Sequence, residues 1–192
     1  KGLANAFRAG IQEALARGAD IIVNTDADNQ YCASDIEKLI TPILSEEADI
    51  TVGARDIANI KEFSLLKKLL QKTGSAILRL LSTTKVDDAP SGFRAFSKQA
   101  ALKINVFDNY TYTMETLIQA GAKGLKVISV PININPQTRK SKLVKNIFDY
   151  VFKSTKTILR MFIVYRPFRF FSFFSCISCF LGLALVCRFL YF

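Results

Sequence analysis

The sequence predicts an α/β fold in which helices flank a mainly parallel sheet, followed by a basic amphipathic helix and an apolar C-terminal segment. Short apolar runs alternate with stretches of helical periodicity as far as residue 130, a pattern typical of βαβ units. A stretch without any charged residue, from Phe170 to Cys187, follows a strongly basic segment. With 192 residues, of which 50% are hydrophobic, the chain can form one packed domain with an attached segment.

The first elements alternate helix and strand. Leu3–Ala16 has apolar residues at helical spacing, and the helix is expected to stop at Gly18. The run Ile21–Val23 predicts a short buried strand, and the polar turn Thr25–Gln30 follows it directly. Ser34 is expected to cap the next helix, which has apolar residues at helical spacing.

The same alternation continues to residue 130. The expected elements are, in order, a strand at Asp49–Gly53, a helix at Phe63–Leu81, a polar loop at Ser82–Pro90, the segment Ser91–Phe96, a helix at Thr113–Ala120 and a strand at Leu125–Val130. Ligands of parallel sheets bind beyond the carboxyl ends of the strands. Because Asp26, Asp28 and Arg55 each follow a predicted strand, we expect them at one edge of the sheet.

The positive charge of the chain is concentrated at its C-terminal end. The formal net charge is +10, and residues 139–192 hold 10 of the 26 basic side chains but only 1 of the 16 acidic ones. Such a segment suits nucleic acid or anionic lipid as a partner. The apolar run that follows favours lipid, so we expect a membrane partner and no nucleic acid.

Residues 143–163 predict an amphipathic helix. Apolar residues from Val144 to Phe162 form one helical stripe, while Lys145, Lys153, Lys156 and Arg160 lie off it. This pattern suits a helix that lies on a membrane surface. An ordinary surface helix that packs on its own domain is the alternative.

Residues 170–187 can form a transmembrane helix. These 18 residues would extend about 27 Å as a helix, close to the ~30 Å thickness of the hydrocarbon core. Arg166 and Arg169 precede the run and only Arg188 follows it, so the preceding domain is expected on the cytoplasmic side of the cell membrane. Three serines within the run leave a buried core helix or a limb of a helical hairpin open.

The absence of histidine narrows the chemistry. It excludes imidazole general bases, histidine-based zinc sites and Ser-His-Asp triads. The four cysteines do not indicate a disulfide framework, because Cys32 stands alone and the other three lie in the apolar tail. Carboxylates must therefore carry any acid, base or metal chemistry.

Two carboxylates follow the first predicted strand. Asp26 and Asp28 are two residues apart, which places them on the same side of an extended segment. Mg²⁺ and Mn²⁺ prefer oxygen ligands and are commonly held by one or two carboxylates together with substrate phosphates. With Gln30 as a further candidate ligand, the motif predicts a metal–diphosphate site; a solvated turn would look alike.

Further candidate groups lie later in the chain. Arg55 and Arg94 carry guanidinium forks suited to phosphate, with surface salt bridges as the alternative. Glu115 stands at a predicted helix start, where a contact with the helix dipole is the other explanation. Arg139 and Lys142 are either a phosphate clamp or the first members of the basic cluster beside the membrane.

Taken together, these segments resemble the family 2 glycosyltransferases, and within them the dolichol-phosphate mannosyltransferase-like, or polyprenyl-phosphate glycosyltransferase, branch. The matching segments follow in the family's order: Thr25–Gln30, Asp88–Phe96, Met114-Glu115, and Val130–Ile132 followed by Arg139–Leu143. One departure is Asn29, where the family usually has Gly or Leu. Another is the missing Gly in Arg139-Lys140-Ser141-Lys142-Leu143.

The resemblance implies a Rossmann-like GT-A fold, a nucleotide-sugar donor, Mg²⁺ or Mn²⁺, and an inverting transfer to a polyprenyl phosphate or another lipid acceptor. Asp26 and Asp28 would match the metal and diphosphate motif, with Gln30 beside it. Arg55 and Arg94 would match positions that face the acceptor phosphate. The basic loop that closes over the substrates would contain Arg139 and Lys142, and Glu115 matches a recurrent acidic position.

The resemblance also divides the chain. Residues 1–138 would be the catalytic domain, 139–169 the basic loop and membrane-surface helix, and 170–192 the transmembrane segment. The chain begins at Lys1 without Met, and the family's N-terminal strand and nucleotide-base loop would precede that residue. We therefore expect a fragment that lacks its N-terminal part.

The catalytic roles depend on the acceptor. A phosphate acceptor is ionised near neutral pH and needs no strong base, so Arg94 and the other cationic groups would orient it. A hydroxyl acceptor would need a base, and Asp28 and Glu115 are the candidates.

Two other functions fit parts of the sequence. A haloacid-dehalogenase-like phosphatase also places Asp-x-Asp after a strand and would form an aspartyl-phosphate at Asp26, although Asn29-Gln30 replaces the expected Gly-Thr. A non-catalytic scaffold would bind anionic lipid through residues 139–169.

Overall fold

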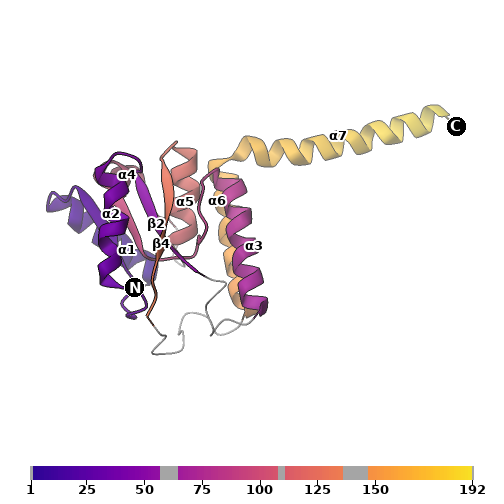
Figure 1. Cartoon of the computed structure of the whole chain (residues 1–192). Helices are drawn as coiled ribbons and strands as arrows, with labels where there is room; N and C mark the ends of the chain where they lie inside the picture. Colours follow the sequence, from indigo (N-terminus) through magenta and orange to yellow (C-terminus); the bar gives the residue numbers. More distant parts are fainter. Residues whose placement is uncertain (1, 57–64, 108–110, 136–146, 192) are drawn as a thin grey trace.

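The computed structural model describes residues 2–56, 65–107, 111–135 and 147–191. Helices lie on both sides of a sheet, and one long helix projects away from this body (Figure 1). The elements are α1 (Leu3–Ala16), β1 (Ile21–Asn24), the 3₁₀ turn η1 (Ala33–Asp35), α2 (Ile36–Leu44), β2 (Ile50–Arg55), α3 (Leu65–Ser82), β3 (Arg94–Ser97), α4 (Lys98–Lys103), α5 (Thr113–Ala122), β4 (Val127–Ile132), α6 (Ile147–Tyr165) and α7 (Pro167–Tyr191).

The predicted helices and strands are present with small shifts at their ends, and two details differ. Ser34 does not cap α2, because it lies inside the turn η1 and the residue before α2 is Asp35. The strand β3 and the helix α4, which follows it without a loop, were not predicted. Ser97 joins them, and its side chain accepts a hydrogen bond from the backbone N–H of Ala100 at 3.1 Å, as an N-cap does.

The sheet has the strand order β1-β3-β2-β4 and is mixed. β2 and β4 are parallel, whereas β3 runs antiparallel to both β1 and β2. Three of the four described strands thus share one direction, as a mainly parallel sheet requires, and β3 is reversed. Since Arg94 is the first residue of β3 and pairs with Asn24, the last residue of β1, the reversal brings Arg94 to the edge where β1 ends.

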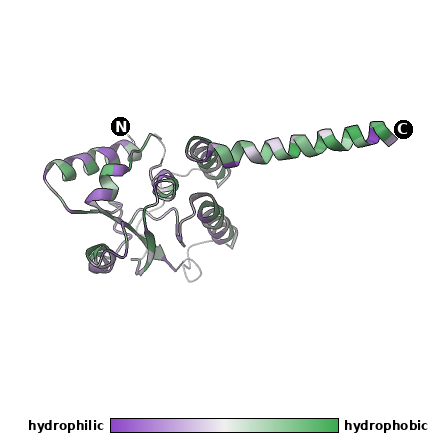
Figure 2. Cartoon of the chain, turned by 90° about the horizontal axis from the view of Figure 1, so that it is seen from above, coloured by the Kyte–Doolittle hydropathy of each residue, from purple (hydrophilic) through white to green (hydrophobic). Residues whose placement is uncertain are grey.

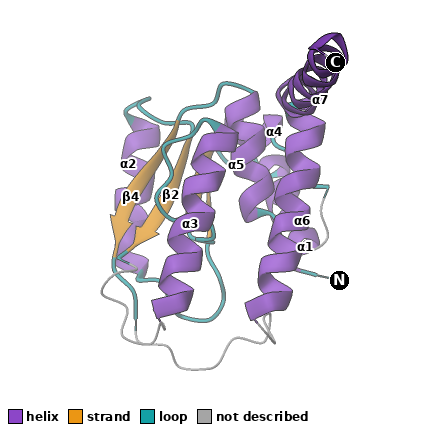
Figure 3. Ribbon diagram, turned by 90° about the vertical axis from the view of Figure 1, so that its right-hand side faces the viewer, coloured by secondary structure: helices purple, strands orange, loops and turns teal. Residues whose placement is uncertain are grey.

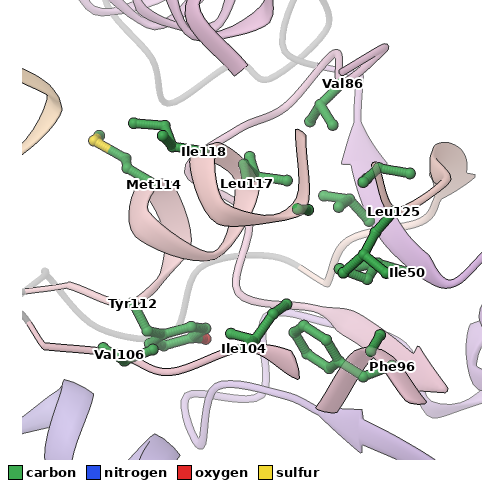
Figure 4. Packing of buried hydrophobic residues seen from close by; sticks show 14 of the residues in the cluster. Ile50, Val86, Phe96, Ile104, Val106, Tyr112, Met114, Leu117, Ile118 and Leu125 are labelled. Atoms are coloured by element: carbon green, nitrogen blue, oxygen red, sulfur yellow. The ribbon is translucent and has the colours of Figure 1, made fainter. Parts of the chain in front are cut away.

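The two faces of the sheet have separate apolar cores. On one face, α2 contributes Leu39 and Ile43, which cluster with Phe93 and Ala95. The larger core, on the other face, lies among α1, α3, α4 and α5 (Figure 4). Residues of β3 alternate between the two cores, which is the period of two expected for a strand covered on both sides.

The helix α6 packs against α5 and α3, with Thr157 buried and Ile158 and Tyr165 at the edge of the larger core. The predicted single stripe is therefore divided. Ile158 faces the domain, whereas Phe152 and Leu159 are exposed. Packing on its own domain accounts for one side of this helix and leaves its other side open to a partner.

The helix α7 is long and apolar enough to cross a membrane. It has 25 residues, a mean hydropathy of 2.3 in its most apolar window and no buried residue, and hydrophobic residues extend along most of it (Figure 2). The described residues do not bury α7, so they give no support to a buried core helix, one of the alternatives. Within the described part of the chain, α7 is the single helix with this length and composition.

Candidate active site

Asp26 and Asp28 lie in the loop that follows β1, at the carboxyl edge of the sheet. The Asp28 carboxylate accepts a hydrogen bond from the backbone N–H of Gln30 at 3.1 Å, which closes a tight turn. Asn29 within this turn has a φ of 57°. Among residues other than glycine, asparagine is one of those that adopt this left-handed conformation most readily, so Asn29 suits this turn.

The segment after β4 holds this loop in place. The backbone N–H of Asn135 donates to the Gln30 carbonyl at 2.9 Å, and the Asn135 side chain donates to the Asn29 carbonyl at 3.0 Å. Tyr31 and Ile134 form an antiparallel bridge. The carboxyl end of β4 therefore supports the turn that contains both aspartates.

The Asp26 carboxylate lies against the backbone of Gly92. A Cβ atom at Gly92 would be 2.5 Å from Asp26 Oδ2 and 2.8 Å from Oδ1. Burial raises the pKa of Asp26 and the Asp28 carboxylate raises it further, whereas Arg55 and Arg94 oppose the shift. Asp26 and Asp28 are both half-buried, and a cation bound between them would offset the repulsion of their two negative charges.

Three side chains hold the Gly92 peptide in position. The Gly92 N–H donates to the Tyr31 hydroxyl at 3.2 Å, and its carbonyl accepts from Asn24 Nδ2 at 2.8 Å and from the Tyr112 hydroxyl at 3.3 Å. The Tyr31 ring stacks on Phe93, with ring centroids 5.0 Å apart. Burial raises the pKa of both tyrosines, so both hydroxyls stay protonated near neutral pH and can donate.

Arg55 forms a two-pronged ion pair with Asp88. Its Nε and Nη2 donate to Oδ2 and Oδ1 of Asp88 at 2.6 and 3.0 Å, and its backbone N–H also donates to Oδ2 at 3.3 Å. Both side chains are largely buried. This bidentate geometry fixes the guanidinium plane, and the charge of Arg55 opposes the rise in the pKa of Asp26.

Arg94 is hydrogen-bonded to groups of the protein itself, so its expected role in facing the acceptor phosphate stays a prediction that its position does not favour. Its side chain is fully buried on the α5 side of the sheet. It donates to the carbonyls of Ala89, Ser91 and Thr113 and to the Thr116 hydroxyl, at distances of 2.6–2.8 Å. Burial lowers the pKa of Arg94 to about 10, so the group remains charged near neutral pH. Arg94 thus ties the Ala89–Ser91 loop to the first turn of α5.

Glu115 is also an internal support, so its expected acid–base role is not favoured by its position. It is fully buried on α5, and both of its carboxylate oxygens accept from the Phe107 N–H, at 3.0 and 3.1 Å. Gln119, one turn later, donates to Glu115 Oε1 at 3.2 Å. The carboxylate therefore binds the segment before α5 onto that helix.

Three predicted site residues remain: one lies in the turn after β1, and two lie outside the described residues. Gln30 is half-buried in the turn beside Asp28. Arg139 and Lys142 lie outside the described residues, so their predicted role as a clamp stays a prediction. Asp88, Tyr31, Tyr112 and Asn24 were not singled out from the sequence. Only Asp88 gave a signal there, as the first residue of the Asp88–Phe96 segment.

The residues present fit a hard divalent cation that is only partly coordinated by protein. Asp26 and Asp28 supply carboxylate oxygens, and Gln30 is adjacent. Among the described residues, no three His, Cys, Asp or Glu side chains cluster closely enough to enclose an ion. Mg²⁺ typically takes its remaining ligands from substrate phosphates and water, and two carboxylates at an open sheet edge allow this.

Comparison with known proteins is consistent with this geometry. Residues 1–104 match the family model for Glycosyl transferase family 2. The UDP-N-acetylglucosamine–dolichyl-phosphate N-acetylglucosaminyltransferase of Methanococcus voltae is 39% identical over 138 residues, which cover 69% of this chain and 55% of that protein. Polyprenol monophosphomannose synthase of Mycolicibacterium smegmatis is 26% identical over 137 residues, which cover 68% and 51%. The chain spans about half the length of the curated relatives it matches.

Solved structures show the same fold at low sequence identity. Glucosyl-3-phosphoglycerate synthase from Mycobacterium tuberculosis, in complex with Mn²⁺, UDP-glucose and phosphoglyceric acid, matches with a TM-score of 0.59 and 14% identity, over 86% of this chain and 55% of that one. The same enzyme with Mg²⁺ and UDP matches with a TM-score of 0.57 and 16% identity, over 86% and 54%. The predicted GT-A-like fold is confirmed.

Proposed function

The chain belongs to glycosyltransferase family 2, and on this basis we propose that it transfers a sugar, with inversion, from a nucleotide-sugar donor to a polyprenyl phosphate at a membrane. The observation that carries the proposal is the pair Asp26 and Asp28, held at the carboxyl edge of the sheet within the electrostatic reach of Arg55. Negative and positive groups thus meet where ligands of open α/β sheets bind.

Asp26 and Asp28 would hold Mg²⁺ or Mn²⁺, with Gln30 as a further candidate ligand. The ion would neutralise the charge that develops on the leaving nucleoside diphosphate. The protein's own part is to fix the two carboxylates before substrate arrives. The Asn135 contacts and the Gly92 peptide supply that rigidity.

A phosphate acceptor suits the charged groups of this edge. Its oxygen is ionised near neutral pH, so it can attack the anomeric carbon while the bond to the diphosphate breaks, without a strong base. Arg55, whose orientation Asp88 fixes, is the described cation that we assign to the acceptor. Arg139 and Lys142 remain candidates for closing over the substrates, whereas Arg94 and Glu115 are assigned to support of the Ala89–Ser91 loop and of the segment before α5.

Relatives support a polyprenyl phosphate as the acceptor. The names of three of them refer to dolichyl-phosphate, polyprenol or undecaprenyl-phosphate. Attachment to a membrane is consistent with such an acceptor, because its chain is apolar. We propose that α7 crosses the cell membrane, that residues 139–169 lie at its surface and that the catalytic domain, residues 1–138, is cytoplasmic, as the excess of Arg before α7 favours.

Transfer can be tested with membranes that contain the intact protein. A panel of labelled nucleotide sugars is supplied with Mn²⁺ or Mg²⁺, and label is measured in the lipid and water phases. We expect metal-dependent label in the lipid phase, and its loss in Asp26→Asn and Asp28→Asn. Asp20→Asn is the matched control, because Asp20 is an exposed carboxylate that precedes the opposite end of β1.

The other outcomes would contradict the proposal in distinct ways. Metal-dependent release of label into water alone would indicate hydrolysis, and a covalent aspartyl-phosphate at Asp26 would support the phosphatase. Binding to anionic lipid with no turnover for any donor would support the scaffold. Full activity in both aspartate variants would refute the site.

A further inference from the structure

The Gly92 peptide lies between the two apolar cores and is held from both of them. Its N–H donates to the hydroxyl of Tyr31, which belongs to the core beside α2. Its carbonyl accepts from the hydroxyl of Tyr112, which belongs to the larger core and immediately precedes α5. Figure 3 shows α2 and α5 on opposite sides of β2 and β4. The peptide is therefore fixed from both faces of the sheet.

The carbonyl of Gly92 is part of a closed triangle of hydrogen bonds. Asn24 Nδ2 donates to this carbonyl at 2.8 Å and to the Tyr112 hydroxyl at 2.7 Å, and the hydroxyl itself donates to the carbonyl at 3.3 Å. Each of the three groups thus binds both of the others. Because hydrogen bonds in buried networks polarise and strengthen one another, removal of the hydroxyl would also weaken the contact between Asn24 and Gly92.

Asn24 connects this triangle to the candidate metal ligand Asp26. The two residues are two positions apart in the segment where β1 ends. Both side chains meet Gly92: Asn24 through its hydrogen bond, and Asp26 through the contact that leaves no room for a Cβ. Among the described residues, no group donates a hydrogen bond to the Asp26 carboxylate, so the contact with Gly92 limits where this carboxylate can lie.

The ring of Tyr112 is fixed independently of its hydroxyl. It stacks on Phe7 of α1, with ring centroids 4.1 Å apart and an angle of 5° between the ring planes. It lies among the residues of the larger core (Figure 4), and only 1% of Tyr112 is exposed. The hydroxyl therefore cannot touch a substrate, and any effect that it has on the reaction must pass through Asn24 and Gly92.

We propose that the Tyr112 hydroxyl is a positioning group for Asp26, which acts through Asn24 and the Gly92 peptide and thereby raises the affinity of the site for a divalent cation. Removal of a group that orients a metal ligand commonly lowers metal affinity by about 10- to 100-fold. The inference rests on the proposed metal site at Asp26 and Asp28, but not on the identity of the sugar or the acceptor.

The variant Tyr112→Phe tests the inference, because it removes the hydroxyl and retains the ring that stacks on Phe7. Binding of Mn²⁺ to the full chain in detergent is titrated by electron paramagnetic resonance, which measures the free ion. We expect the Kd for Mn²⁺ to rise about ten-fold. Tyr165→Phe is the matched control, because Tyr165 packs against the same core from α6, and its Kd should equal that of the wild type.

Transfer kinetics separate positioning from a direct part in the reaction. A group that acts on metal affinity alone leaves the reaction unchanged once the site is filled. The activity that Tyr112→Phe loses at limiting Mn²⁺ should therefore return at saturating Mn²⁺, with the kcat of the wild type. A kcat that stays low at saturating Mn²⁺ would overturn the proposal.

A double-mutant cycle tests the route through Asn24. Asn24→Ala should weaken Mn²⁺ binding as well. The combined variant of Asn24 and Tyr112 should lose less affinity than the product of the two single effects, because both groups hold the same Gly92 carbonyl. Fully multiplicative losses would show that the two residues act independently and would overturn this route.

The outcomes also distinguish this inference from the metal site on which it rests. If Asp26→Asn abolishes Mn²⁺ binding but Tyr112→Phe binds like Tyr165→Phe, the inference is wrong and the metal site stands; a lower unfolding temperature of Tyr112→Phe would then show that the hydroxyl only stabilises the fold. If Asp26→Asn binds Mn²⁺ as tightly as the wild type, the metal site is refuted and the inference with it. Near-UV circular dichroism checks the fold of each variant, and Asn24→Ala alone decides if Tyr112→Phe fails that check.

Discussion

The carboxylate of Asp26 is in contact with the backbone of Gly92, and the two residues come from segments that the sheet reverses against each other. Asp26 follows β1, and Gly92 precedes β3, which runs antiparallel to β1. A glycine is needed here because any Cβ would be 2.5 Å from a carboxylate oxygen. The Asp26 carboxylate, a candidate metal ligand, can thus take this position only because residue 92 has no Cβ atom.

We expect Gly92→Ala to weaken both Mn²⁺ binding and sugar transfer, because Asp26 must move away from the new methyl group. The fold should lose about 1–3 kcal/mol, as overpacked sites commonly do. Mn²⁺ titration and thermal unfolding measure the two effects. Gly10→Ala in α1, where a Cβ meets nothing within 4 Å, is the matched control and should gain up to about 1 kcal/mol. Unchanged Mn²⁺ affinity in Gly92→Ala would contradict the assignment of Asp26.

Replacement of Asp88 should be costly, because it leaves the largely buried guanidinium of Arg55 without its bidentate partner. We expect Asp88→Ala to destabilise the fold by about 3 kcal/mol or more and to raise the KM for the acceptor. The neighbouring Asp87 offers a control, since its pair with Arg79 is between exposed side chains and should be worth less than about 1 kcal/mol. Equal unfolding midpoints for Asp88→Ala and Asp87→Ala would refute the structural importance of the Arg55 pair.

The role of Arg94 as an internal brace can be separated from a role in phosphate binding. Arg94→Lys keeps the charge but cannot reproduce a fork that reaches Ala89, Ser91 and Thr113 together. We expect a lower unfolding temperature and a lower kcat, with little change in the KM for the acceptor. A large rise in that KM at unchanged unfolding temperature would instead show that Arg94 binds the acceptor.

Asp26→Asn should abolish transfer but stabilise the metal-free protein. Burial and Asp28 raise the pKa of Asp26 in the folded state, so the ionised carboxylate opposes folding. This cost appears as the pH rises from the unfolded pKa toward the raised folded value, and it is fully present above that value. Unfolding in EDTA near neutral pH should therefore occur at a higher temperature in the variant than in the wild type, and added Mn²⁺ should reverse the order. A less stable variant in EDTA would contradict the raised pKa.

Glu115→Gln tests whether the buried carboxylate is a base or a support. The amide has one acceptor oxygen instead of two. If that oxygen takes the place of Oε1, where it can accept from both Phe107 and Gln119, the NH₂ group takes the place of Oε2 and faces the Phe107 N–H, a second donor. We expect a loss of roughly 1–3 kcal/mol in stability and an unchanged pH profile of transfer. Loss of the basic limb of that profile, with stability retained, would restore Glu115 as a catalytic base.

Much of the secondary structure was predictable because each element carries its own periodicity. The helices α1, α2 and α5 have apolar residues at helical spacing, and β1 and β2 are short apolar runs. The unit β3–α4 was not predicted, because a strand of four residues is too short for an alternating pattern and runs directly into a helix. Its reversed direction could not be foreseen either, since strand direction depends on pairing and not on local sequence.

Composition and local order were enough to establish several features of this protein. The Asp-x-Asp turn after a strand, the basic C-terminal region, the apolar helix α7 and the likeness to glycosyltransferase family 2 all follow from residues that are close together in the chain. The roles of Arg55, Arg94 and Glu115 required the folded arrangement. The partner of Arg55 is 33 residues away, and that of Arg94 on α5 is 19 to 22 residues away. An arginine that could bind a phosphate and one that supports a loop have the same side-chain chemistry. They differ in their burial and in the acceptors around the guanidinium, and these two features arise only when distant segments pack together.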